Sequence, residues 1–505
     1  MKSYPRLILV VLCFAFYGLT SYGGIRAPDA EVVFRVAQNL ANGNGFGVSS
    51  DMESWPGFGV ATGKDSVLYA VYPPGESVAL VPFIFAARWI NSSRWYDGFS
   101  LPLSHYVDAG LVKILNHTED PNPEPHALRF ICSLFNILIT TLVVLTYYGL
   151  AFKMTQSVDA TFITSLLFAF GTVFWNYANT LFSEPLAVLL VLVSFKGLVM
   201  ADAAVGGKFN SQKSWVWILS GLSLGLAVNT HTLTILCAPF FLWYIVRMAG
   251  GDRKAPLLWS AGLLIGLAIL GSFNWIRFGD AFETGRSLSL HNRVEWVTFG
   301  SVIFWRNFYG LFLGAGKGLV WFCPAAVLGL LLWRNLHRIQ RTLALPLSLM
   351  TGTVIGVISA YNDWHAGFCL GPRYTMMIIP FLLLPVAFWW KNISTRTRWI
   401  ALPVVIVCCV HQLYFNLGEI FSFDHIVKWT YLSKGIDVFI NNRFYLEWRF
   451  SPLTSLLEFE RGPFLLSFVP LTNKVLWLIL SAVTGGVLFF IARVFVDQKK
   501  PPSNK

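Results

Sequence analysis

Long apolar runs, separated by short polar segments, extend along almost the whole chain. The first run begins at Leu7 and ends at about Gly23. Further runs lie near residues 75–90, 127–150, 158–178, 184–203, 215–230, 232–248, 256–277, 318–333, 344–361, 373–390, 400–417 and 475–495. As helices, most of these runs are about long enough to cross a hydrocarbon core of about 30 Å. The pattern therefore predicts an all-α polytopic membrane protein.

Composition and charge support this fold class. Hydrophobic residues make up 55% of the 505 residues and charged residues only 13%, against about 25% charged residues in ordinary soluble domains. The formal net charge of +12 comes from Lys and Arg side chains that mostly sit in short loops between apolar runs. Such loops orient membrane helices by the positive-inside rule, so we expect no nucleic-acid partner. The seven cysteines show no metal-binding spacing.

The distribution of basic residues also predicts the topology. Lys2 and Arg6 at one end, and the basic tail around Lys499 at the other, place both termini in the cytoplasm. The number of crossings must then be even, yet the pattern gives thirteen runs. The conflict lies within 75–126, so twelve or fourteen crossings remain open. The loops 24–74, 279–316, 362–372 and 418–474 fall on the outer side.

The first of these loops opens with an amphipathic helix. Val33, Val36, Ala37 and Leu40 recur at helical spacing, which predicts an interfacial helix that begins after Pro28 and ends near Gly43. Its first turn presents two carboxylates, Asp29 and Glu31, at the boundary between membrane and water. They either stabilise the positive end of this helix or carry chemistry.

Six short motifs occur in a fixed order along the chain. They are Pro28-Asp29-Ala30-Glu31, Tyr72-Pro73-Pro74-Gly75, Phe170-Gly171-Thr172-Val173-Phe174-Trp175-Asn176-Tyr177, Leu181-Phe182-Ser183-Glu184-Pro185, Gly314-Ala315-Gly316-Lys317-Gly318-Leu319 and Gly371-Pro372-Arg373-Tyr374. In order and membrane context, residues 1–390 resemble the GT-C superfamily of polytopic glycosyltransferases. Its members use polyprenyl-phosphate sugars and include protein O-mannosyltransferases and lipid A aminoarabinose transferases.

The resemblance implies a membrane glycosyltransferase. We expect it to move a sugar, with inversion, from a polyprenyl-phosphate donor to a lipid, glycan or protein acceptor. The site would face the extracytoplasmic side of a cell membrane, the inner membrane of a bacterium. In the family an acidic residue of the first loop is the general base, and that role falls on Asp29. Many relatives have adjacent Asp-Glu here, so Glu31 is the alternative base or the ligand of a divalent metal, and metal dependence stays open.

Two cationic motifs fit a phosphate-binding role. Lys317 and Arg373 each follow a glycine-containing turn at the outer start of a helix, and Tyr374 follows Arg373. A helix start favours an anion, and Arg can hold a phosphate with two parallel hydrogen bonds. We expect these three residues to bind the donor phosphate. The alternative is that both cations only extend from the membrane interface into water.

Four further residues are candidates for contacts with donor or acceptor: Arg35, Glu184, Asp363 and His365. Glu184 directly follows Ser183 at a predicted helix start, and its side of the membrane depends on the unresolved parity. Asp363 and His365 precede the Arg373 motif. Each also has an ordinary structural explanation, as a helix-start acid or a solvated loop residue.

The organisation expected from these patterns has three parts. Residues 1–417 form a GT-C-like transmembrane catalytic module that includes the outer loop 24–74, residues 418–474 form an extracytoplasmic segment, and residues 475–505 form the last transmembrane helix and the cytoplasmic tail. The alternative function is a lipid or solute transporter or flippase. Such a protein is expected to show inverted repeats and ionisable residues at mid-membrane, but no repeat is visible and Lys196 is the chief charge near a span centre.

Overall fold

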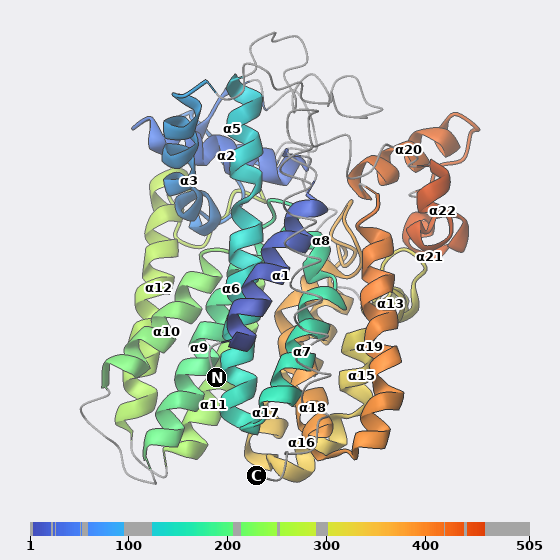
Figure 1. Cartoon of the computed structure of the whole chain (residues 1–505). Helices are drawn as coiled ribbons and strands as arrows, with labels where there is room; N and C mark the ends of the chain where they lie inside the picture. Colours follow the sequence, from blue (N-terminus) through green and yellow to red (C-terminus); the bar gives the residue numbers. More distant parts are fainter. Residues whose placement is uncertain are drawn as a thin grey trace.

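The structure is a computed structural model, which describes residues 4–21, 24–25, 27–50, 52, 59–94, 124–205, 214–249, 253–288, 301–418, 420–438 and 442–459. Long helices form a bundle, and shorter elements gather at its upper end (Figure 1). The predicted last helix at 475–495 and the tail around Lys499 lie outside the described residues.

The described helices follow the predicted apolar runs closely. In chain order they are α1 (Tyr4–Leu19), α2 (Pro28–Ala41), α3 (Gly75–Asn91), α5 (Glu124–Ser133), α6 (Phe135–Thr155), α7 (Val158–Phe170), α8 (Phe174–Ala178), α9 (Glu184–Val205), α10 (Ser214–Val228), η4 (Thr232–Cys237), α11 (Ala238–Met248), α12 (Lys254–Phe278), α13 (Ser301–Leu313), α14 (Leu319–Phe322), α15 (Pro324–Leu331), α16 (Trp333–Ile339), α17 (Arg341–Ala360), η6 (Arg373–Ile378), α18 (Ile379–Asn392), α19 (Thr395–Phe415), α20 (Ile420–Leu432), α21 (Arg443–Leu446), η8 (Trp448–Phe450) and α22 (Pro452–Phe459). Short breaks, such as Cys323 before Pro324, divide several runs into two helices.

Within the described residues, six helical segments are long and apolar enough to cross a membrane. They are Ala127–Thr155, Glu184–Ala201, Lys254–Phe278, Arg341–Ala360, Arg373–Asn392 and Thr395–Phe415. Four shorter apolar helical segments accompany them: Tyr4–Leu19, Val158–Phe170, Ser214–Val228 and Thr232–Met248. The predicted helical, polytopic fold is confirmed, whereas the count of twelve to fourteen crossings stays a prediction.

The run near 75–90 does not cross the bundle as its apolar length suggested. It forms α3, which packs against α2 and α5 at the upper end of the molecule (Figure 1). Phe85 and Trp89 on one face are 53% and 78% exposed, whereas Leu80 and Ile84 on the other are buried. This amphipathic helix suits the membrane interface.

A small antiparallel sheet lies in the first loop, where the sequence predicted only helix and loop. It consists of β1 (Gly47–Val48), β2 (Val60–Thr62) and β3 (Leu68–Ala70) in the order β1-β3-β2. Val60 pairs with Ala70, and Gly47 pairs with Tyr69. Strands of two or three residues are too short to give a sequence period, which explains why the pattern missed them.

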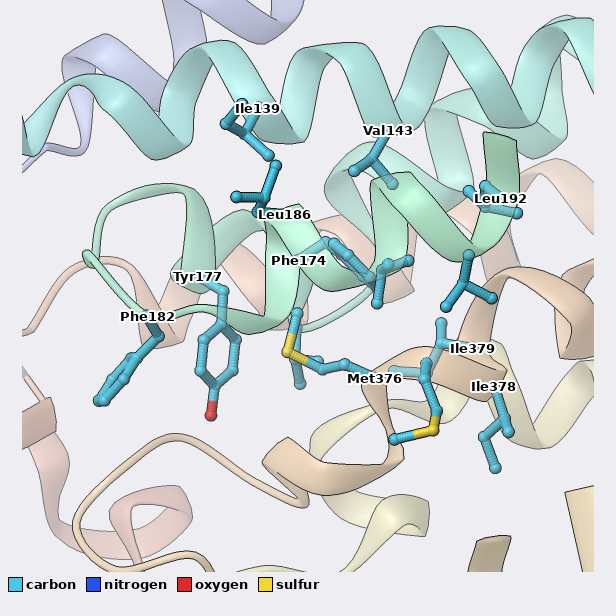
Figure 2. Close-up of a cluster of buried hydrophobic side chains, with 14 of the residues drawn as sticks. Ile139, Val143, Phe174, Tyr177, Phe182, Leu186, Leu192, Met376, Ile378 and Ile379 are labelled. Carbon is cyan, nitrogen blue, oxygen red and sulfur yellow. The ribbon is translucent and has the colours of Figure 1, made fainter. Parts of the chain in front are cut away.

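A buried apolar cluster lies directly beneath the upper end of the bundle. Ile139 and Val143 of α6 face Leu186 and Leu192 of α9 (Figure 2). Phe174 and Tyr177 of α8 lie between these helices and Met376 of η6. The hydroxyl of Tyr177 donates a hydrogen bond to the Leu370 carbonyl oxygen at 2.9 Å. This packing fixes where α9 and η6 begin, and both begin at charged residues.

Candidate functional site

Asp29 and Glu31 point to different sides of α2. Two residues along an α-helix turn the direction of a side chain by about 200°. The side chain of Asp29 is accordingly 31% exposed, and that of Glu31 is fully buried. The Ala30 between them therefore separates the two carboxylates in space.

Glu31 lies in a buried ion-pair network. Its Oε1 is 2.6 Å from Nη2 of Arg129 and 2.9 Å from Nε of Arg35, and Nε of Arg129 donates to Oε2 at 3.1 Å. Burial alone would raise the pKa of Glu31, but the two guanidinium groups outweigh it and lower that pKa. Arg35 also donates to the Ser49 hydroxyl at 3.2 Å. Both oxygens of Glu31 are thus engaged in holding α2 against α5.

Asp29 contacts groups from two distant parts of the chain. Oδ1 accepts a hydrogen bond from the Tyr72 hydroxyl at 2.8 Å, and Oδ2 lies 3.5 Å from both Nη atoms of Arg373. Burial raises the pKa of Tyr72 well above its ordinary value, and the negative charge of Asp29 adds to this. Tyr72 therefore keeps its proton and orients the Asp29 carboxylate.

Arg373 joins this group to Glu184. It opens η6 as a buried residue, its Nε lies 3.1 Å from Oε1 of Glu184, and its guanidinium stacks over the ring of Phe182 at 4.4 Å. Nε2 of His231 is 3.5 Å from the same Glu184 oxygen. Glu184 consequently lies at the same end of the bundle as Asp29 and Arg373.

Glu76 is an acidic residue that the sequence reasoning missed. It lies in the first turn of α3, is 1% exposed, and neither of its side-chain oxygens has a hydrogen-bond partner in the described part of the chain. Burial raises its pKa well above the ordinary value, and the charges of Glu184 and Asp29 raise it further. Burial thus favours the neutral, protonated form of Glu76. Its position directly after the Tyr72–Gly75 motif was the available signal.

Asp363, His365 and Tyr374 form a second buried group. The Tyr374 hydroxyl is 3.3 Å from Oδ2 of Asp363, and Nδ1 of His365 is 3.3 Å from Oδ1. Burial raises the pKa of Asp363 to about 6, although Arg286 and Arg373 oppose this, and burial lowers the pKa of His365 well below its ordinary value. Nδ1 of His365 accepts a hydrogen bond from the Gly367 amide at 3.0 Å. His365 is therefore neutral, and its contact with Asp363 is no ion pair.

Lys317 lies apart from Asp29 and faces backbone oxygens. Its buried ammonium donates to the carbonyl oxygens of Gly367 at 2.8 Å and Cys369 at 2.5 Å, and to Cys369 Sγ at 3.1 Å. These contacts use all three ammonium donors. The neighbouring glycine has a packing role, because the amide of Gly316 donates to the Tyr445 carbonyl oxygen at 3.0 Å and a Cβ there would come within 3.0 Å of Tyr445 Cα. Lys317 thus stabilises the loop that leads to Arg373.

Arg286 is a second residue that sequence reasoning did not single out. It follows α12, its side chain is exposed, and Nη1 donates to the Tyr361 hydroxyl at 3.4 Å. Its charge interacts with Tyr374, Tyr72 and Asp363. Arg286 therefore lies near both Tyr72, the partner of Asp29, and the pair formed by Asp363 and Tyr374. Only folding brings this loop Arg to the site, so no local motif marked it. Among the described residues, no group of three or more His, Cys, Asp or Glu is arranged to hold a metal ion.

Comparison with solved structures finds similar proteins. ArnT from Cupriavidus metallidurans bound to undecaprenyl phosphate matches 100% of this chain and 82% of its own at 13% identity, with a TM-score of 0.51. The archaeal oligosaccharyltransferase AglB from Archaeoglobus fulgidus, in complex with an inhibitory peptide and a dolichol-phosphate, matches 88% of this chain and 60% of its own at 10% identity, with a TM-score of 0.46. No protein-family model and no curated protein matches the chain. The likeness to ArnT along the whole chain confirms the expected architecture: this protein has the GT-C fold.

Proposed function

We propose that the protein is a membrane glycosyltransferase that moves a sugar from a polyprenyl-phosphate donor to an acceptor hydroxyl, with Asp29 as the general base. The ArnT structure that shares its fold is bound to undecaprenyl phosphate. Lipid, glycan and protein acceptors all suit this chemistry. The upper end of the bundle in Figure 1, where Asp29 lies, is proposed to be the extracytoplasmic side of a bacterial inner membrane.

The observation that carries the proposal is the contrast among four carboxyl groups at one end of the bundle. Glu31 is held by two guanidinium groups, Glu184 pairs with Arg373, and Glu76 is buried, which raises its pKa well above the ordinary value. Asp29 is 31% exposed, and Tyr72 orients one of its oxygens. A general base must reach the proton that it removes. Asp29 best meets that condition.

The proposed reaction is a single displacement. The acceptor oxygen forms a bond to the anomeric carbon while the bond from that carbon to the donor phosphate oxygen breaks. The acceptor proton passes to Asp29, and the electron pair leaves with the polyprenyl phosphate. Attack from the face opposite the leaving group inverts the anomeric centre. Metal dependence is left open in this scheme.

Arg286 and Arg373 are the proposed cations for the donor phosphate. Arg286 is exposed, with a long contact of 3.4 Å to the Tyr361 hydroxyl, so its fork is accessible to a phosphate. Arg373 lies 3.5 Å from Asp29 and is paired with Glu184. In this proposal it contacts the phosphate while it keeps its ion pair with Glu184. Tyr374 and Asp363 support this side of the site. Lys317, whose donors are engaged, positions the loop in this proposal.

The test is release of undecaprenyl phosphate by the purified full chain in nanodiscs. The substrates are undecaprenyl-phosphate-linked hexoses and pentoses, offered with extracted envelope lipids and glycans as acceptors, and mass spectrometry detects the product. The proposal expects release that depends on both donor and acceptor. A transporter or flippase would leave every donor intact, and that result would contradict the proposal.

A further inference from the structure

Two cations lie on the bundle far from the candidate site. Lys196 follows Glu184 by twelve residues in α9, which places it about 18 Å along the helix from the site. Arg6 lies in the first turn of α1, at the end opposite the chain that leads to Asp29. Figure 1 shows this end of α1 beside α6 in the lower part of the bundle. Lys196 thus lies just past the middle of α9 and Arg6 at the far end of α1, both on the side away from the site.

Both cations rest against the same turn of α6. The guanidinium of Arg6 lies over the ring of Tyr148 at 5.5 Å, and a Cβ at Gly149 would come within 2.7 Å of Lys196 Nζ. The charges of Arg6 and Lys196 are close enough to interact. Gly149 thus leaves the space in which the Lys196 ammonium lies against the α6 backbone. Helices α1 and α9 therefore each place one positive charge against the same turn of α6.

This pair has no counter-charge within the described part of the chain. Neither Arg6 nor Lys196 forms an ion pair with any described Asp or Glu, and no described carboxylate contributes to the electrostatic surroundings of Lys196. Like charges this close in a membrane-embedded region are costly without an anion. Arg6 is exposed and Lys196 half-buried, so both are accessible from the lipid side.

We propose that Arg6, Lys196 and the turn at Tyr148–Gly149 bind the phosphate of an anionic phospholipid in the leaflet opposite the candidate active site. A phosphate diester between the two cations removes their repulsion and accepts hydrogen bonds from both. Its acyl chains remain in the bilayer beside α1 and α9. This site is independent of the glycosyltransferase reaction and holds whether or not the protein has that activity.

The test titrates lipids onto the delipidated full chain and counts bound molecules by native mass spectrometry. The probes are phosphatidylglycerol, cardiolipin, phosphatidylcholine and inorganic phosphate. Wild-type protein is expected to bind the two anionic lipids at least tenfold more tightly than phosphatidylcholine. Arg6→Gln and Lys196→Gln are each expected to weaken that binding roughly tenfold or more, because a charge-assisted hydrogen bond is lost. Lys391→Gln removes an exposed cation elsewhere and serves as the matched control.

A third variant tests the geometry without removing a charge. Gly149→Ala places a methyl group where the Lys196 ammonium lies and is expected to weaken anionic-lipid binding, whereas Gly352→Ala, with nothing within 4 Å, leaves it unchanged. Melting curves without added lipid show whether each variant is folded. Equal binding by Lys196→Gln and Lys391→Gln would overturn the proposal. So would equal affinity for phosphatidylcholine, or displacement of the lipid by millimolar inorganic phosphate.

Discussion

At the scale of single residues, two neighbouring carboxylates of α2 have very different surroundings. Asp29 and Glu31 share the first turn of one helix, yet one is partly exposed beside Tyr72 and the other is buried between Arg129 and Arg35. Burial with two cations makes a carboxylate part of the framework, whereas partial exposure leaves it free to take a proton. The two residues should therefore fail in different ways when substituted.

Glu31→Gln is expected to destabilise the protein by about 3–5 kcal/mol, since it removes the buried negative charge shared by Arg129 and Arg35. Asp29→Asn should change stability much less, because its side chain is 31% exposed and an amide oxygen can still accept from Tyr72. Thermal melting in one detergent compares both variants with wild type. If Glu31→Gln melts together with Asp29→Asn, the buried network does not stabilise α2.

Asp363 makes the stability depend on pH. Burial raises its folded-state pKa to about 6 from the ordinary value of 3.8. Between these values the folded state binds a proton that the unfolded chain has released, so the free energy of unfolding falls as pH rises, by on the order of 3 kcal/mol. Asp363→Asn should lack this fall. The measurement is melting temperature from pH 4 to pH 7 for both proteins, and identical slopes would rule out a buried titrating Asp363.

At the scale of elements, glycines allow α10 and α12 to pack closely. In α10 and α12, Cβ atoms at Gly221 and Gly262 would collide with the backbone oxygens of Trp259 and Ile218, and one at Gly266 would come within 2.5 Å of Gly225 Cα. Small residues four apart let membrane helices approach this closely. The same spacing in α17, at Gly352 and Gly356, meets nothing within 4 Å. Spacing alone therefore does not distinguish a contact from a free face.

Gly262→Ala is expected to push α12 from α10 and to lower the melting temperature clearly, because backbone atoms cannot give way. Gly356→Ala is the control and should leave the melting temperature unchanged or slightly higher, since Ala favours a helix. Thermal melting of the two purified variants decides the matter. A Gly262→Ala protein as stable as Gly356→Ala would show that the helices do not pack this closely.

The same scale shows what the sequence could and could not predict. The apolar period of α2 gave its start after Pro28 and nearly its end, because one face of a helix leaves a local pattern. The topology placed Arg373 on the same side as Asp29, but it left the side of Glu184 open, and only the fold brings Glu184 to Arg373. The contact between Gly316 and Tyr445 could not be predicted, since it joins segments far apart in sequence. A local motif cannot show whether its glycines leave room for a ligand or for the backbone of another segment.

At the scale of the whole molecule, the account predicts which parts of the chain share a side of the membrane. The strand residue Thr62 and the residue Lys434, which follows α20, are exposed, and the exposed Arg396 lies in the first turn of α19, whose start is at the lower end of the bundle. Single cysteines at Thr62 and Lys434 should react with a membrane-impermeant maleimide from outside intact cells, and one at Arg396 should not.

The seven native cysteines favour this labelling experiment. Six are buried and Cys409 is only partly exposed, so background labelling should be low. Lysed cells provide the control, in which all three introduced cysteines should react. Labelling of the cysteine at Arg396 from outside, without labelling at Thr62, would invert the proposed orientation and place the candidate site on the cytoplasmic side.

The most direct measurement of the central claim is the rate of undecaprenyl phosphate release by wild type and Asp29→Asn, at saturating donor, in nanodiscs. Asn keeps the shape of Asp29 and can still accept a hydrogen bond from Tyr72, but it cannot take the acceptor proton. Loss of a general base slows a reaction by about 10²–10⁴-fold. The account predicts a fall of that size, with donor binding and melting temperature nearly unchanged. A rate within threefold of wild type would contradict it.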